Sequence, residues 1–93
     1  MADDARLALQ KVKINRRRGS LFVYDDRLVI STDAGETTIP LARLDKLATR
    51  RTLRGAKLVM LFEGEDVIEV RGLSASDTSV AHRTIVGVAR RLR

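Results

Sequence analysis

The chain has 93 residues, with 18 lysines and arginines against 12 carboxylates and a formal net charge of +6. This length allows one domain with a single modest core. The absence of cysteine excludes disulfides and thiolate metal sites, and no apolar run approaches the ~18 residues that span a bilayer. Met1–Asp4 lacks the positive charge of a secretory signal, so we expect a cytoplasmic protein. Only three residues are aromatic, and the core is therefore expected to be aliphatic.

The N-terminal half predicts a meander of short strands. Residues 1–10 are expected to form a tail or a short helix, because Leu7 and Leu9 do not settle a period. Beyond them, β-branched and aromatic residues alternate with turn residues, which is typical of strands joined by hairpins. Asp25–Asp26 suits a turn because short carboxylates bond their own backbone. The expected strands are Lys11–Asn15, Ser20–Tyr24, Arg27–Thr32 and Glu36–Ile39.

The middle of the chain contains one ambiguous segment and one clear hairpin. Over residues 40–48, a leading proline and leucines three apart favour a helical turn. Thr49–Thr52 then looks extended, and Arg54–Gly55 marks a loop. Lys57–Phe62 and Val67–Val70 flank an acidic turn, which predicts a β-hairpin.

The C-terminal segment changes from a strand period to a helical period. Ser74 and Asp77 have the spacing of a capping box, which predicts a helix over about 75–92. Gly87 inside this helix costs on the order of 1 kcal/mol relative to alanine. We interpret it as a position where the helix approaches a sheet closely. The residues at helical spacing are Val80, Ala81, Ile85, Val88, Ala89 and Leu92.

Two stretches resemble pleckstrin-homology-like (PH-like) domains. Gly19–Ile30 (GSLFVYDDRLVI) is similar to the strand–turn–strand of bacterial PH and GRAM domains, and to a strand pair in the PH domain of the general transcription factor H core subunit. Thr38–Leu44 (TIPLARL) resembles another bacterial PH strand, which implies a bent strand over 40–48. The resemblance covers residues 11–93 and implies a mainly β fold, a small barrel of two antiparallel sheets capped by the C-terminal amphipathic helix. It implies binding of lipid, peptide or another subunit, but no particular ligand.

The sequence predicts no catalytic site, metal site or cofactor. His82, the only histidine, lies beside Arg83 on the polar side of the predicted helix. The carboxylates of Asp25–Asp26 and 63–66 lie at predicted hairpin tips, whereas an acid–base pair needs two carboxylates facing each other. Neither a nucleophile elbow nor a glycine-rich phosphate loop occurs. We therefore expect a protein that is not an enzyme.

Two basic clusters are the candidate binding surface for an anionic partner. If the barrel brings them to one end, they would form a single positive surface that grips carboxylate or phosphate groups. Arginines that only keep the domain soluble are the alternative interpretation. The clusters are Arg16, Arg17 and Arg18, and Arg50, Arg51, Arg54 and Lys57.

The basic clusters lead to a functional prediction. We expect a non-catalytic binding or adaptor domain that recognises an acidic protein or peptide through this arginine-rich surface. Peripheral attachment to anionic, phosphoinositide-like membrane lipid is the alternative. Nucleic acid is disfavoured because no aromatic residue interleaves the basic residues, and a homo-oligomer is left open.

Overall fold

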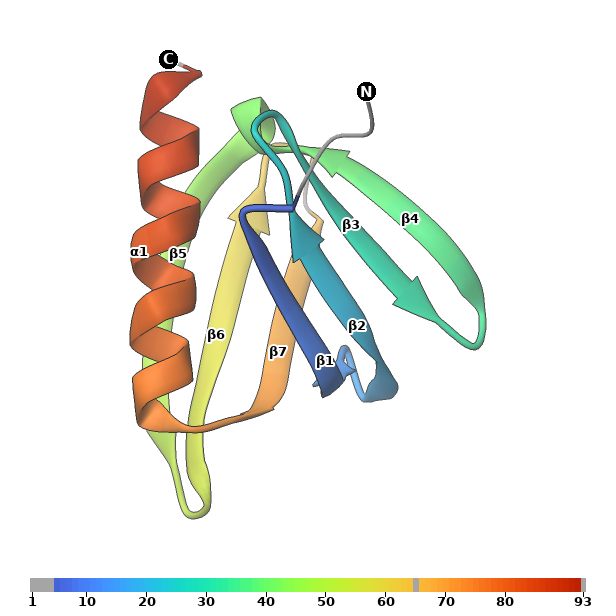
Figure 1. The fold of residues 1–93 in the computed structure, drawn as a ribbon, viewed down its shortest axis with the longest axis vertical. Helices are drawn as coiled ribbons and strands as arrows, with labels where there is room; N and C mark the ends of the chain where they lie inside the picture. Colours follow the sequence, from blue (N-terminus) through green and yellow to red (C-terminus); the bar gives the residue numbers. More distant parts are fainter. Residues whose placement is uncertain (1–4, 65, 93) are drawn as a thin grey trace.

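The computed structural model describes residues 5–64 and 66–92, and within them contains seven β-strands and one long α-helix (Figure 1). The expected mainly β fold with a C-terminal helix is confirmed. A 3₁₀ turn, η1 (Leu41–Arg43), separates the fourth strand from the fifth, and the helix α1 (Ala75–Arg91) follows the last strand. The strands are β1 (Leu7–Ile14), β2 (Arg17–Val23), β3 (Arg27–Thr32), β4 (Gly35–Pro40), β5 (Leu44–Thr52), β6 (Gly55–Phe62) and β7 (Val67–Leu73).

The strands form one antiparallel sheet in the order β4-β3-β2-β1-β7-β6-β5. Its weakest junction is between β1 and β7, which share only two paired positions, Lys13 with Arg71 and Ile14 with Val70. Figure 1 shows β1–β4 and β5–β7 as two groups that splay apart from this junction. The two expected sheets are therefore two halves of one sheet, with β4 and β5 at its open edges.

An aliphatic core lies between the two halves of the sheet and α1. Along β6, buried residues alternate with partly exposed ones, as expected for a strand with one face on the core. Phe62 is the one aromatic side chain among the described core residues. Within the described residues, no helix is long and apolar enough to cross a membrane. The helix contributes Ala81, Ile85, Val88 and Ala89 to the core.

The start of α1 follows the prediction, whereas the interpretation of Gly87 is wrong. Ser74 Oγ accepts a hydrogen bond from the Asp77 backbone N–H at 3.0 Å, which is the Ser74 half of the predicted capping box. Gly87, however, is exposed, and a Cβ atom added there would meet nothing within 4 Å. The helix instead approaches the sheet through Ala81 and Ile85, which are fully buried.

The first hairpin begins earlier than predicted. β1 starts at Leu7, so the expected tail or short helix is wrong for Leu7–Gln10, and residues 1–4 lie outside the described residues. The physical reason is long-range pairing: Leu7 lies opposite Val23 of β2, and local spacing carries no information about that partner. Arg17–Arg18, expected in a break between strands, likewise belongs to β2.

The ambiguous segment 40–48 combines both interpretations. Pro40 ends β4 with a φ of −64°, and Leu41–Arg43 forms the 3₁₀ turn η1. From Leu44 onward the chain is strand, as the resemblance implied. The helical turn buries Leu41 in the core and directs the chain from one half of the sheet to the other.

Candidate functional site

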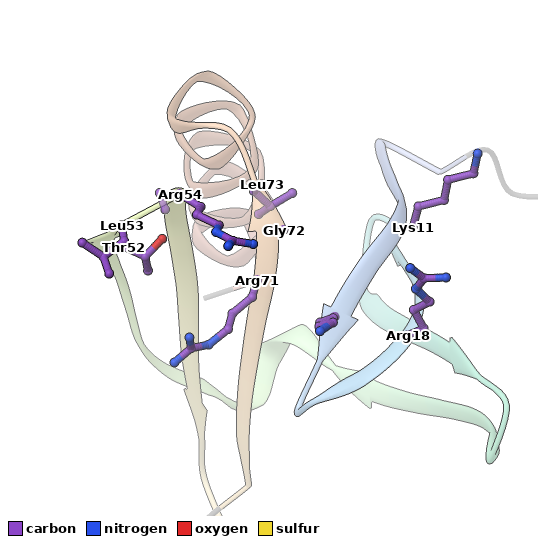
Figure 2. A pocket seen from close by; sticks show the side chains of 10 residues that line it. Lys11, Arg18, Thr52, Leu53, Arg54, Arg71, Gly72 and Leu73 are labelled. Carbon is purple, nitrogen blue, oxygen red and sulfur yellow. The ribbon is translucent and has the colours of Figure 1, made fainter.

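A hollow of about 640 Å³ opens between the β5–β6 turn, the end of β7 and the strands β1 and β2. We call it the basic pocket, because five of the described side chains that line it are cationic and none is a carboxylate. Figure 2 shows Lys11 and Arg18 on the β1–β2 side of the pocket, and Arg54 and Arg71 on the hairpin side. The five cationic residues are Lys11, Lys13, Arg18, Arg54 and Arg71.

The basic pocket exists because β7 separates from β1 soon after the two strands meet. Lys13 and Arg71 form the last pair on this side. The next residue, Gly72, has a φ of +90°, a conformation that favours glycine and turns β7 away. On the facing strand, Lys11 has a φ of +56° and lies in a bulge of β1 against β2. Bulges bend a strand and re-aim its side chains, and here the bend opens the hollow.

Asn15 fastens the other end of the β1–β7 junction. Its backbone N–H donates to Glu69 O at 2.9 Å, and its Nδ2 donates to Val67 O at 3.1 Å. Its Oδ1 accepts from the Glu69 backbone N–H at 2.8 Å. Asn15 and Arg16, with φ values of 49° and 73°, are the two central residues of the β1–β2 turn, as in a type I′ hairpin. This turn therefore ties together the two halves that form the pocket walls.

Strand register also places cations side by side across the sheet. Arg50 on β5 lies opposite Lys57 on β6. Arg71 on β7 lies opposite Lys13 on β1, which lies opposite Arg18 on β2. We call these five residues the basic row; at about 4.8 Å between strands it extends about 19 Å along the sheet. Like charges directly opposite each other destabilise a sheet, so folding alone does not account for the row.

Glu69 connects the two parts of the basic row. Its carboxylate accepts from Arg71 Nε at 2.5 Å and lies 3.5 Å from Lys57 Nζ. The hydrogen bond from Arg71, with the charges of Arg71 and Lys57, lowers the pKa of Glu69 below its ordinary value. Arg50, Lys13 and Arg18 form no ion pair within the described part of the chain. The row therefore keeps a large excess of positive charge.

Four of the seven predicted binding residues belong to this surface. Arg18 and Arg54 line the basic pocket, while Arg50 and Lys57 belong to the basic row. The two sequence clusters thus meet, although the first contributes only Arg18. Whether these residues bind an anion stays a prediction.

The other three predicted residues lie elsewhere. Arg51 lies opposite the buried Ala56, on the other face of the β5–β6 hairpin from Arg50. Arg17 pairs with Asp33 at 3.5 Å. Arg16 occupies the β1–β2 turn and does not line the pocket.

Sequence reasoning missed Lys11, Lys13 and Arg71. Lys11 and Lys13 are separated by Val12 in β1, and Arg71 is the one cation in β7, so none of them belongs to a run of basic residues that marks a cluster. The alternation of lysine with valine and isoleucine before Asn15 indicates exposed lysines on one face. Only the pairing of β1 with β7 shows that Arg71 lies beside them.

The remaining titratable groups are arranged without an evident chemical centre. His82 is partly buried on α1. The turn carboxylates are ion-paired, Asp25 with Arg6 at 2.5 Å and Asp26 with Arg27 at 2.8 Å. Among the described residues, no group of three histidine, aspartate or glutamate side chains is placed to hold a metal ion.

No family model and no curated protein matches this sequence. One chain of a solved structure, described as "Structure of the Spt16D Pob3N heterodimer", matches with a TM-score of 0.78 at 13% identity, over 96% of this chain and 53% of that chain. The chain has a PH-like fold. It spans about half the length of the PH-like neighbour, and at this identity the likeness concerns the fold alone. The PH-like resemblance is confirmed at that level, while the bacterial, GRAM or transcription-factor type stays a prediction.

Proposed function

We propose that this PH-like domain is a non-catalytic binding domain that holds an acidic segment of a partner protein against the basic pocket and the basic row. One observation carries the proposal: these cations, drawn from five strands and one turn, have a single carboxylate, Glu69, among them within the described residues. Carboxylates of a partner would supply the missing negative charge. Arginine suits this task because its guanidinium binds carboxylates with two parallel hydrogen bonds.

The dimensions of the surface fit an extended peptide. A row of about 19 Å corresponds to roughly six residues of extended chain at about 3.3 Å each. The basic pocket, at about 640 Å³, has room for several side chains at one end of that path. The PH-like neighbour comes from a structure described as a heterodimer, and this supports a protein as the partner.

The test is binding of a fluorescein-labelled peptide of eight glutamates, followed by fluorescence anisotropy. The pocket variant is Arg18→Glu with Arg54→Glu. The matched control is Arg83→Glu with Arg90→Glu on exposed positions of α1. Each variant changes the net charge from +6 to +2, because every Arg→Glu change removes two positive charges. We expect the pocket variant to lose at least about tenfold in affinity, and the control to stay within about threefold.

An equal loss in both variants would show a response to overall charge and would overturn the proposal. A second arm separates the membrane alternative, since the same cations would attract anionic lipid. Wild type and pocket variant are sedimented with neutral phosphatidylcholine vesicles and with vesicles containing phosphatidylserine. If the wild type pellets selectively with the anionic vesicles and ignores the peptide at the same salt, membrane attachment replaces the acidic partner.

A further inference from the structure

The basic pocket has an apolar corner that the proposed function leaves unexplained. Ala56 and Leu73 line its floor and are 7% and 5% exposed. Leu53 lines the rim from the β5–β6 turn and is fully exposed. An exposed leucine adds nothing to the hydrophobic stabilisation of the fold. Stabilisation of the fold therefore does not explain why a leucine lies beside a cationic hollow.

The turn itself does not require a leucine. The β5–β6 ladder continues to the pair Thr52 and Gly55, so Leu53 and Arg54 form a two-residue turn. Neither has a positive φ, and turns of this length favour small polar residues over leucine. A Cβ atom at Gly55 would lie 2.6 Å from Leu73 O, so the hairpin end packs tightly on β7. Leu53 is thus presented on a supported turn next to the pocket.

The charged residues near Leu53 in the sequence are all basic. From Lys46 to Phe62 the sequence has five cations and no carboxylate. Three of these cations, Arg50, Arg51 and Arg54, are exposed within four residues of Leu53. The pocket thus combines an apolar corner on the hairpin side with cationic side chains on both sides, and this combination suits a ligand that is both acidic and apolar.

We infer that the basic pocket selects acidic protein segments that carry an apolar side chain, and that Leu53 is the residue that contacts this side chain. The inference rests on the proposed function and adds a rule for the partner's sequence. Carboxylates on the segment face the basic row, while its apolar side chain fills the corner formed by Leu53, Ala56 and Leu73. A flat bilayer surface reaches Leu53 but not the floor of the hollow, so a protein segment fits the corner better than a membrane does.

A double-mutant cycle between protein and peptide tests this contact. The probes are two labelled peptides, four glutamates on either side of a central leucine or a central serine. We expect the wild type to bind the leucine peptide about tenfold more tightly, as expected for burial of much of one leucine side chain. In Leu53→Ser the preference should fall to about twofold, with the affinity for the serine peptide and the melting temperature unchanged. Leu53→Met should retain the preference.

Two matched variants complete the experiment. Val67→Ser changes an exposed apolar residue that does not line the basic pocket and should keep the wild-type preference. A wild type that binds both peptides equally, or a preference that survives in Leu53→Ser, would overturn the inference while the proposed function stands. The affinity of the Arg18→Glu, Arg54→Glu variant for the serine peptide tests the proposed function alone: a loss of affinity supports it, and an unchanged affinity contradicts it. If Leu53→Ser instead abolishes pelleting with anionic vesicles and leaves the peptide preference intact, Leu53 is a membrane contact and the inference is wrong.

Discussion

The β1–β4 half of the sheet and the β5–β6 hairpin differ in how many of their cations are paired with carboxylates. In and next to the first half, three arginines are matched by carboxylates across turns and strands, whereas Lys11, Lys13 and Arg18, which line the basic pocket, form no ion pair with the described residues. Along the hairpin no carboxylate occurs between Lys46 and Phe62, and Arg50, Arg51 and Arg54 form no ion pair with the described residues. The matched pairs are Arg6 with Asp25, Arg17 with Asp33, and Arg27 with Asp26.

This difference separates what holds the domain together from what is left for a partner. Exposed ion pairs contribute only about 0–1 kcal/mol each, but they remove net charge from the surface that carries them. Opposed cations on neighbouring strands act against folding, so a hairpin that retains them departs from the rule that local features support the fold. Changes to the ion-paired or closely packed residues of the first half are therefore expected to alter stability, and changes to the unpaired cations of the hairpin and the pocket to alter binding.

The largest effect is expected for Gly19→Ala in β2. A Cβ atom there would lie 2.3 Å from the backbone oxygen of Ser31, so β3 must shift. We expect a loss of about 3 kcal/mol in the free energy of unfolding, measured by urea denaturation. The control, Gly87→Ala, places a methyl group in open space on α1 and should stabilise the protein by about 1 kcal/mol. Equal stability of Gly19→Ala and wild type would contradict the close packing of β2 on β3.

Asn15→Ala acts where the two regions meet. It removes two side-chain hydrogen bonds to β7 and places alanine at a φ of 49°. We expect a loss of about 2 kcal/mol. Because this turn ties the pocket walls together, the affinity for the eight-glutamate peptide should also fall by about threefold at a temperature where the variant is folded. Asn15→Gly, which tolerates the backbone angle but lacks the bonds, should lose only about half of that stability. If both variants bound the peptide with wild-type affinity, the β1–β7 junction would not determine the shape of the pocket.

The elements that could be predicted from sequence are those whose pattern is local. The helix combines a cap at Ser74 with apolar residues at a period of 3.6, and both signals are contained within its own residues. The alternation of β6 is likewise visible in its sequence, because one face of the strand is buried along its length. The hairpin formed by β6 and β7 follows from the turn residues between them.

The candidate site could be predicted only in part because it depends on register. Lys13 and Arg71 lie far apart in sequence, and their meeting requires the β1–β7 pairing. A break after Asn15 could be predicted, but the two-residue length of the β1–β2 turn could not, since Arg16 occupies a left-handed position where glycine is the usual signal. The basic clusters were visible as composition, but strand alternation, which separates Arg50 from Arg51, decides which members share a face.

Glu69→Gln removes the carboxylate that accompanies the basic row. The cations of the basic row then repel one another more strongly, and we expect a loss of about 0.5–1 kcal/mol in the free energy of unfolding. The affinity for the eight-glutamate peptide should rise about threefold. The wild type should show the matching pH dependence. The pKa of Glu69 is lowered on folding, first by the hydrogen bond from Arg71, so its stabilising contribution is complete above the ordinary value of 4.5. That contribution is lost as the pH falls through the lower, folded pKa. In Glu69→Gln this component of the acid destabilisation should be absent.

The smallest effect is expected for Asp33→Asn, which removes a carboxylate from the charge-matched half. Asp33 and Arg17 are 82% and 61% exposed and 3.5 Å apart, so water screens the pair. We expect a change of at most about 0.5 kcal/mol in stability and no measurable change in peptide affinity. The variant has a net charge of +7, one more than the wild type, as does Glu69→Gln. If both variants bound the peptide more tightly by the same factor, total charge would govern binding and the hairpin would have no special part in it. A gain confined to Glu69→Gln assigns the effect to the basic row.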